Sequence, residues 1–301
     1  MIVLSLYSYL SAIGFHDYKG TKEWNHLITQ VIEYPTEKYI AKQDGKIIIM
    51  EYYKAYGERF GLLVRGVAEE GEQLLVKTFD PIVEAKYNTD VIEVEVEEAE
   101  EEDIYYATCE EEKTGTEVTF QLQNVIDYLD TTKIDQTTIE GVKIVGLGIE
   151  GKIIFPVEKT ETEKKIEQEE ETWYQELIQR AREGDEEAQE LIDIEEEEIS
   201  KIIAERLQYE DFLTIVEGYF MPFADIETTY SVLGIILEVE EMKNKETGEI
   251  IYWLYINCMN MKFEVCINKK DLTGIPLVGM RFMGVCWVQG KITFSEEDNV
   301  F

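Results

Sequence analysis

The sequence predicts an α+β protein with a β-rich antiparallel N-terminal half, a helical connector and a small C-terminal domain of five strands. Three observations support this fold class. Strand-like runs fill residues 46–155, and nothing between them is long enough for a crossover helix. Apolar residues recur at helical spacing over 161–219. Residues 230–294 are rich in β-branched and aromatic residues and are interrupted by Gly, Pro and Asn.

The N-terminal half begins with two predicted helices. Residues 6–15 form a short helix that Gly14 ends, and Thr21 caps a second helix that stops at Pro35. An antiparallel meander follows, with strands at 46–53, 60–68 and 73–79. Further strands are expected at 91–96, 104–108, 116–123, 142–149 and 152–155. The acidic run 97–103 between them is interpreted as a solvated loop.

Residues 146–151, Gly-Leu-Gly-Ile-Glu-Gly, match the G-x-G-x-x-G pattern of dinucleotide-binding sites. Such a site needs a helix directly after the glycines, so that the phosphates meet a helix N-terminus. Here the chain continues as a β-like run that Pro156 stops. We therefore interpret the glycines as hairpin and bulge positions. Residues 114–155 and 247–294 end in similar short strings, GKIIF at 151–155 and GKITF at 290–294. An old duplication of a β-unit therefore stays open as an alternative.

The connector is predicted to contain several helices. Gly184 is suited to end the first of them and Asp185 to cap the next. Two short helices are expected after Asp185, around residues 188–192 and 199–207. A last helix should run from Phe212 to the region of Tyr219 and stop at Pro222. The expected units of the chain are residues 1–157, 158–225 and 226–294, followed by an acidic tail over 295–301.

The C-terminal unit divides into strand-sized pieces. They are expected at residues 234–239, 250–256, 261–267, 278–288 and 291–294. Five short strands with a non-strand connection after the third resemble an oligonucleotide/oligosaccharide-binding (OB) barrel. The glycines at 279, 284 and 290 suit the bends of a small barrel. A five-stranded antiparallel sheet packed on a helix is the alternative.

Charge is distributed unevenly along the chain. The net charge is −36, yet residues 230–294 carry seven basic and seven acidic residues and are neutral. The acidic remainder repels phosphate backbones, so no nucleic-acid binding is expected. No run approaches the ~18 consecutive apolar residues of a membrane span, and no signal peptide is recognisable. We expect a cytoplasmic protein that does not bind membranes.

The residues of common catalytic and metal sites are sparse. The chain has two histidines, His16 and His26, and four cysteines without C-x-x-C spacing. No G-x-S-x-G, Walker or H-E-x-x-H motif occurs. We therefore assign no catalytic residue, no metal site and no cofactor. The function expected first is a non-enzymatic binding or scaffold protein that uses its C-terminal β domain, and the alternative is a carboxylate-dependent hydrolase or transferase.

The neutral segment 230–294 supplies the candidate binding residues, which are Trp253, Tyr255, Arg281 and Trp287. Tyr, Trp, Met and Arg are enriched at interface cores, whereas most charged residues are depleted there. Alternation along a strand puts Trp253 and Tyr255 on one face. We expect that face to meet either the helical connector or a second subunit, so a protein partner or a homo-oligomer is possible through this segment.

Several strings also resemble a known family. They are residues 8–15 (SYLSAIGF), 120–124 (FQLQN), 219–223 (YFMPF), 230–234 (YSVLG) and 265–272 (VCINKKDL). Over nearly the whole chain they resemble an uncharacterised domain-of-unknown-function family of clostridial-type Firmicutes. The resemblance implies a bacterial cytosolic protein. It implies no activity, cofactor or catalytic residue.

Overall fold

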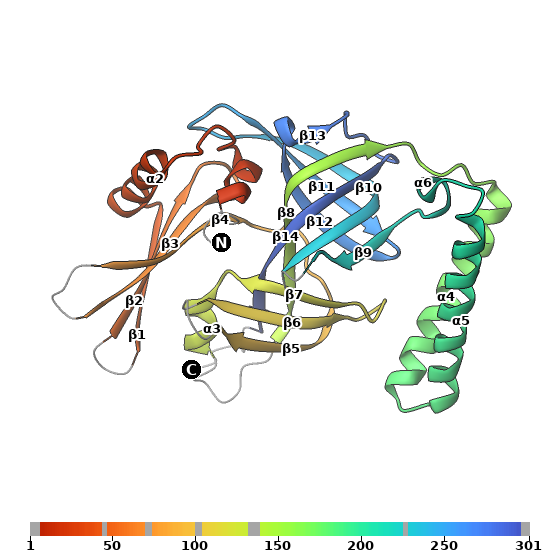
Figure 1. Ribbon diagram of the computed structural model, residues 1–301. Coiled ribbons are helices and arrows are strands. Elements are labelled where there is room, and N and C mark those ends of the chain that lie inside the picture. The colour runs from red at the N-terminus through yellow and green to blue at the C-terminus, as the bar shows by residue number, and fades with distance from the viewer. Residues whose placement is uncertain are drawn as a thin grey trace.

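The computed structural model describes residues 7–43, 47–69, 74–99, 104–131, 139–224 and 228–295. Within these residues the chain is an α+β protein with a four-stranded sheet, a ten-stranded sheet and few helices (Figure 1). The predicted fold class is therefore confirmed at this level. The expected acidic tail lies outside the described residues except for Ser295, as does part of the acidic run 97–103.

The four-stranded sheet is an antiparallel meander in the order β1-β2-β3-β4. Its strands are β1 (Glu37–Gln43), β2 (Ile47–Ala55), β3 (Phe60–Glu69) and β4 (Leu75–Val83). The meander confirms three predicted strands. The additional strand, β1, was not predicted, because its apolar and polar residues do not alternate clearly. Among the described strands it pairs only with β2.

Two helical segments lie against this sheet. The 3-10 helix η1 (Tyr7–Ile13) contacts β4 on one side and strands of the second sheet on the other, and α2 (Thr21–Glu33) contacts β2 and β3. Gly14 ends η1 as predicted, with a φ of 89° that favours glycine. The predicted cap of α2 was wrong by one residue: Gly20 is the N-cap and makes no side-chain cap.

The ten-stranded sheet contains a closed ring of five strands. The ring pairs β8 with β12, β12 with β11, β11 with β10, β10 with β14, and β14 again with β8. Its strands are β8 (Ile139–Ile154), β10 (Thr229–Lys243), β11 (Ile250–Cys258), β12 (Met261–Asn268) and β14 (Arg281–Phe294). The β8–β12 pair is parallel and the other four are antiparallel.

The remaining strands of this sheet extend the ring. The strands β5 (Val91–Glu98), β6 (Tyr105–Glu111) and β7 (Glu117–Leu122) form an antiparallel group that joins β14 through a parallel β7–β14 pair. The short strands β9 (Tyr219–Pro222) and β13 (Leu272–Thr273) pair with β10 and β8. The sheet is thus mixed, whereas the sequence predicted antiparallel pairing for the N-terminal half.

Three predictions about the ring strands were wrong. Residues 278–288 and 291–294 do not form separate strands, because β14 runs without interruption through Gly290. The fifth strand of the ring is β8, which lies before the connector in sequence. Residues 142–149 and 152–155 were expected as two strands and instead belong largely to this one strand of 16 residues.

The G-x-G-x-x-G glycines lie within β8 and make room inside the ring. A Cβ atom at Gly146 would lie 2.8 Å from the ring of Phe263, and one at Gly151 would lie 2.5 Å from the ring of Phe282. The hairpin interpretation of these glycines was therefore wrong. A bulge does occur within this stretch, but the unpaired residue in the β8–β14 register is Ile149 and not one of the glycines.

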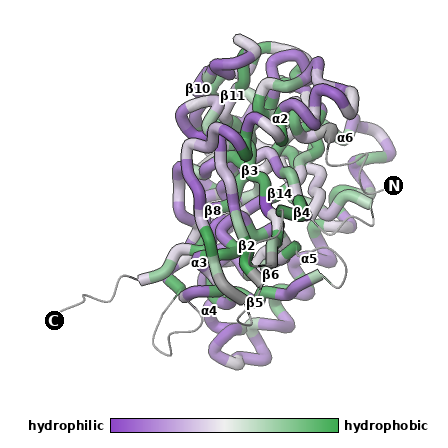
Figure 2. The backbone as a smooth tube through the Cα atoms, turned by 90° about the vertical axis from the view of Figure 1, so that its left-hand side faces the viewer, coloured by the Kyte–Doolittle hydropathy of each residue, from purple (hydrophilic) through white to green (hydrophobic). Residues whose placement is uncertain are grey.

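The buried side chains form two large cores. One fills the ring and continues under β6, β7 and the helix α3 (Val125–Thr131), which was not predicted. The other lies between the outer face of the ring and the segments η1, α2, β2 and β3. In Figure 2 the hydrophobic stretches, drawn in green, gather along the strands in the middle of the molecule.

The connector holds two long helices and one short helix. These are α4 (Glu161–Arg182), α5 (Glu186–Arg206) and α6 (Phe212–Ile215). Gly184 and Asp185 separate α4 from α5 as predicted, and the Asp185 carboxylate accepts hydrogen bonds from Glu187 and Ala188. The two short helices expected after Asp185 are one continuous helix. The last helix has only four residues, because the chain turns into β9 at Tyr219. None of the described helices is long and apolar enough to cross a membrane.

Candidate functional site

Polar and aromatic side chains gather on the outer face of β10, β11 and β12, next to the second core. Apolar residues such as Leu254 and Phe263 point into the ring, so the alternate residues Trp253, Tyr255 and Glu264 point outward. Tyr255 and Glu264 are direct cross-strand partners. The aromatic face predicted from the sequence therefore exists, and a buried carboxylate lies beside it.

The segment that joins β4 to β5 crosses this face, and Glu264 fastens it there. The Glu264 carboxylate accepts hydrogen bonds from the backbone N–H of Lys86 at 2.9 Å, the backbone N–H of Tyr87 at 2.6 Å and Nε1 of Trp253 at 2.7 Å. Only 2% of Glu264 is exposed. Burial raises the pKa of this carboxyl above its ordinary value, and the three N–H donors act against that rise.

Two cations lie close to the ring of Trp253. The guanidinium of Arg59 is 4.9 Å from the centre of its ring, and the ammonium of Lys86 is 4.8 Å away. Cation–π contacts of this kind stabilise a buried tryptophan by about 1–2 kcal/mol each. The indole is therefore held by the chain itself and is not free to contact a ligand.

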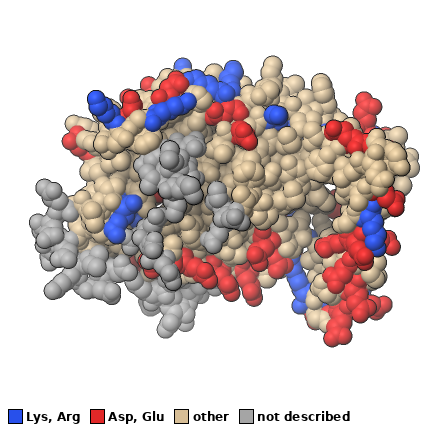
Figure 3. All heavy atoms as spheres, in the orientation of Figure 1, with Lys and Arg blue, Asp and Glu red and all other residues tan. Residues whose placement is uncertain are grey.

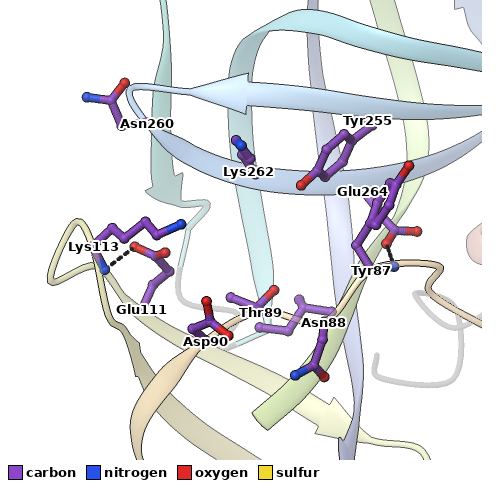
Figure 4. A pocket seen from close by; sticks show the side chains of 11 residues that line it. Tyr87, Asn88, Thr89, Asp90, Glu111, Lys113, Tyr255, Asn260, Lys262 and Glu264 are labelled. Atoms are coloured by element: carbon purple, nitrogen blue, oxygen red, sulfur yellow. Dashed lines mark hydrogen bonds between the residues drawn. The ribbon is translucent and has the colours of Figure 1, made fainter. Parts of the chain in front are cut away.

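A hollow opens next to this cluster, between the segment 87–90, the end of β6 and the β11–β12 hairpin. Its volume is about 130 Å³. It is lined by Tyr87, Asn88, Thr89, Asp90, Glu111, Lys113, Ile144, Tyr255, Asn260, Lys262 and Glu264. Figure 4 shows Glu111 and Lys113 on one side, Tyr87, Tyr255 and Glu264 on the other, and Lys262 between them on β12.

The two ends of the hollow are rigidly built. Glu111 is buried, and its Oε2 accepts hydrogen bonds from the backbone N–H of Lys113 at 3.1 Å and from the backbone N–H and the hydroxyl of Thr114, both at 2.7 Å. At the other end the rings of Tyr87 and Tyr255 pack at 4.5 Å between centres. Burial also raises the pKa of Tyr255, so its hydroxyl stays protonated and can donate a hydrogen bond.

The hollow combines cations and anions. Lys113 and Lys262 have no ion pair with any residue that the structure describes. Asp90 and Glu111 supply negative charge to the same space. Among the described residues, no Ser, His or Cys lines the hollow to act as a nucleophile. Within the described part of the chain, no cluster of three His, Cys, Asp or Glu has the arrangement of a metal site.

The four sequence-predicted binding residues lie in three places. Tyr255 lines the hollow, and Trp253 is buried behind it. Trp287 is buried in the second core, where its ring packs 4.7 Å from that of Tyr9. Arg281 is buried beside the connector and donates to three backbone carbonyls. The structure thus brings Trp253 and Tyr255 together and leaves Arg281 and Trp287 apart from them.

The element that covers the Trp253 face differs from the expected one. Side chains of the N-terminal half bury it, and the core that contains Trp253 includes no described residue of the connector. Sequence reasoning also missed Glu264, Lys262 and the segment 86–90. The alternation of residues 261–267 did place Lys262 and Glu264 on one face, but carboxylates are so numerous in this chain that no single one could be selected.

A second polar cluster joins η1 to the turn after β12. The Nδ1 atom of His16 lies 3.1 Å from the hydroxyl of Ser11 and 3.0 Å from the carboxylate of Asp271. In a catalytic triad the histidine uses one nitrogen for the serine and the other for the acid. Both contacts here use the same nitrogen, so the trio has the residue types of a triad without its geometry.

Comparisons with known proteins give one match. A family model described as "Domain of unknown function, E. rectale Gene description (DUF3881)" covers residues 10–290. No curated protein and no solved structure matches the chain. No specific function follows from these comparisons. The resemblance noted in the sequence is confirmed, because the match spans nearly all of the chain: the protein belongs to the DUF3881 family of domains of unknown function.

Proposed function

We propose that this protein is a cytosolic, non-enzymatic binding protein that holds a small polar molecule in the hollow beside Tyr255 and Glu264. One observation carries the proposal. The hollow is bordered by two lysines, Lys113 and Lys262, that have no ion pair with any described residue. In a chain with a net charge of −36, these two cations can bind an anionic group of a ligand, while Asp90, Glu111 and Glu264 line the same hollow.

The chemistry of the lining defines the ligand class. A carboxylate placed between Lys113 and Lys262 would receive charge-assisted hydrogen bonds. An ammonium or hydroxyl group on the same molecule would face Asp90 and Glu111. Cavities of about 150 Å³ hold a benzene-sized molecule, so a hollow of about 130 Å³ suits a ligand of similar size. A small zwitterion such as an amino acid meets all three requirements.

The connectivity of the ring supports the OB-like assignment with one change. In an OB barrel, strands 1 to 3 form a meander, strand 5 pairs in parallel with strand 3, and strand 4 pairs with strands 1 and 5. The meander β10-β11-β12, the parallel β12–β8 pair and the position of β14 reproduce this pattern. Strand 5 is then β8, moved to the front of the chain. OB domains bind ligands on the face of strands 2 and 3, which corresponds to β11 and β12 at the hollow.

The same face is a poor surface for single-stranded nucleic acid, which supports the expectation that none is bound. Such binding needs exposed aromatic platforms in a positive groove. Here the N-terminal half buries Trp253, and Asp90 and Glu111 border the open part. The space left open suits a small molecule rather than a chain of nucleotides.

The alternative function, a carboxylate-dependent hydrolase or transferase, has one observation in its favour. Burial raises the pKa of Glu264, which is what a general acid requires. Both oxygens of this carboxylate already accept hydrogen bonds, from Lys86, Tyr87 and Trp253. A structural role explains those contacts, so binding is the better proposal.

The proposal is tested by a ligand screen on the full chain. Thermal unfolding is measured with each of the twenty amino acids and with small dicarboxylates, at about 10 mM. A ligand present at 100 times its Kd stabilises the folded state by about 2.7 kcal/mol, which raises the Tm of a chain of this size by about 5 °C.

Variants then locate the site. We expect Lys262→Ala and Lys113→Ala each to weaken binding about tenfold in calorimetry, since each removes one charge-assisted hydrogen bond. Lys22 on α2 is also exposed and does not line the hollow, so Lys22→Ala should leave the affinity unchanged. The proposal is wrong if no compound shifts the Tm, or if binding survives the Lys113→Ala/Lys262→Ala double variant. Turnover of the ligand in an NMR time course, lost in Glu264→Gln, would establish the enzyme instead.

A further inference from the structure

The helical hairpin α4–α5, residues 161–206, is a rod fastened to the rest of the molecule at both ends; we call it the arm. At the hairpin loop, Arg182 donates from Nε and Nη2 to the carboxylate of Glu110, at 3.0 and 2.6 Å. Beyond its other end, in and directly after α6, Leu213 and Val216 offer their carbonyls to Arg281, which donates to them at 2.7 and 2.8 Å. Figure 1 shows the arm standing beside the strands on the right. Its surface is therefore held in a fixed position.

The arm buries apolar side chains only near its loop. Leu177, Ile178 and Ala188 are buried there. Further along, the apolar side chains are exposed: Ile166 by 50%, Trp173 by 41%, Ile199 by 41% and Ile202 by 56%. Side chains of this kind usually pack against a neighbour, because each one buried gains about 1.5–3 kcal/mol.

These four exposed residues share one stretch of the arm. Ile166 and Trp173 are seven positions apart on α4, and Ile199 and Ile202 are three apart on α5, so each pair lies on one face of its helix. The hydrogen bond from Tyr174 to Glu196, at 3.2 Å, fixes how the two antiparallel helices align. That alignment places Ile199 and Ile202 beside the segment between Ile166 and Trp173. The four exposed apolar side chains thus lie along the same length of the arm.

The same stretch is strongly negative. Residues 161–206 contain eighteen acidic and six basic residues. Figure 3 shows Asp and Glu, in red, gathered over the arm at the lower right. A second copy of this chain, or any acidic protein, is repelled by such a surface, whereas a basic segment is attracted to it. An apolar stripe on that segment would cover the isoleucines and Trp173.

We propose that the arm is a docking site for a basic amphipathic helix of another protein. The apolar stripe of that helix packs on Ile166, Trp173, Ile199 and Ile202, and its Lys or Arg residues face the flanking glutamates. None of these four residues lines the hollow beside Tyr255, and the docking proposal does not depend on the ligand proposed there. With both sites, the protein would bind a small ligand in the hollow and a protein partner on the arm.

The test uses the full chain and a synthetic probe. The probe is a labelled 18-residue peptide of Leu and Lys, with leucine at helical spacing, and its control has the same composition with that spacing scrambled. We expect fluorescence anisotropy to give micromolar binding of the probe, at least tenfold weaker for the scrambled peptide, and weaker again at high salt.

Matched variants locate the binding. Ile166→Ala/Ile202→Ala should weaken the affinity at least tenfold, and circular dichroism should show unchanged helix content. Ile275→Ala/Leu277→Ala removes two apolar side chains that are more exposed, at 72% and 58%, and far from the arm in sequence. It should change the affinity less than twofold. The proposal is overturned if the peptide does not bind, if the scrambled peptide binds equally well, or if both double variants have the same effect. Concentration-dependent dimers that Ile166→Ala/Ile202→Ala abolishes would identify a second copy as the occupant instead.

Discussion

Replacing Arg281 by lysine should release the connector from the ring. The guanidinium of this buried residue donates Nε to the carbonyl of Phe155 at 2.8 Å, Nη1 to that of Val216 at 2.8 Å and Nη2 to that of Leu213 at 2.7 Å. Phe155 directly follows β8, just before the connector, whereas Leu213 and Val216 lie near the C-terminal end of the connector. One residue of β14 therefore joins the end of β8 to the end of α6.

The expected loss in the free energy of unfolding follows from the geometry of the hydrogen-bond donors. The three carbonyls meet three different nitrogens of a planar fork, and a lysine ammonium offers its protons from a single point. At most one of the three hydrogen bonds survives. Hydrogen bonds to a charged group contribute about 1.5–3 kcal/mol each, so two lost bonds cost about 3 kcal/mol at the lower end of that range. The lower end applies because Leu213 and Val216 are half-buried and their carbonyls can reach water once released.

Two measurements check this prediction. Urea unfolding followed by circular dichroism gives the free energy of unfolding, and hydrogen exchange followed by mass spectrometry locates the change. We expect exchange to increase in residues 155–219 and to stay constant in β11 and β12. Arg206→Lys, which alters an exposed ion pair with Glu210, is the control and should change neither quantity. The reasoning is refuted if Arg281→Lys unfolds with the free energy of the parent, or if exchange rises equally in every strand.

Three further predictions concern the ring and the arm. Glu264→Gln tests the direction in which burial shifts the pKa of the Glu264 carboxyl. A carboxyl whose pKa is raised in the folded state favours folding fully only below its unfolded pKa, near 4.5. The free energy of unfolding of the parent relative to this variant should therefore fall as pH rises from 4.5. A relative stability that increases with pH would mean that the N–H donors outweigh burial. Gly146→Ala should destabilise by about 1–3 kcal/mol through overpacking, and Phe263→Leu should restore part of the loss in a double-mutant cycle; additive effects would exclude this contact. Arg182→Ala should speed hydrogen exchange near the hairpin loop while the urea midpoint stays constant, and unchanged exchange would show that the arm is held by other contacts.

Local sequence patterns predicted most elements of the fold. The errors arose where pairing between strands that are distant in sequence determines the structure. Residues 261–267 alternate cleanly and form β12, and Gly184 with Asp185 marks the break between α4 and α5. In contrast, Phe212 to Tyr219 has helical spacing, but pairing of β9 with β10 takes the last of these residues into a strand. No local signal indicates that β8 pairs with β14, since the two segments lie on opposite sides of the connector.

Glycine was the least reliable guide, because its role depends on the neighbour across the sheet. Gly290 was expected to end a strand, yet β14 continues through it. A Cβ atom at this position would lie 2.5 Å from the ring of Phe120 on β7, so the glycine leaves space for that ring. The sequence contains both residues and gives no indication that they meet.

For the candidate site, side-chain type and alternation predicted part of the arrangement. Trp253 and Tyr255 share a face, as alternation requires, and Tyr255 lines the hollow. Arg281 is of a residue type that is enriched at interfaces, but its guanidinium donates its hydrogen bonds to backbone carbonyls of the same chain. Glu264 is distinguished from the other acidic residues only by its burial, which a single sequence does not reveal.

The position of β8 before the connector has a consequence for synthesis on the ribosome. Ring closure needs β14, which follows β8 only after the connector and three further ring strands have been made. At about 5–20 residues per second, the nascent chain carries β8 without its ring partners for roughly ten seconds. Contacts this distant in sequence also slow folding, because a long loop must close before they form. The ring is therefore completed only after β14 has been made, and a nascent chain stopped within the connector exposes a strand whose ring partners do not yet exist.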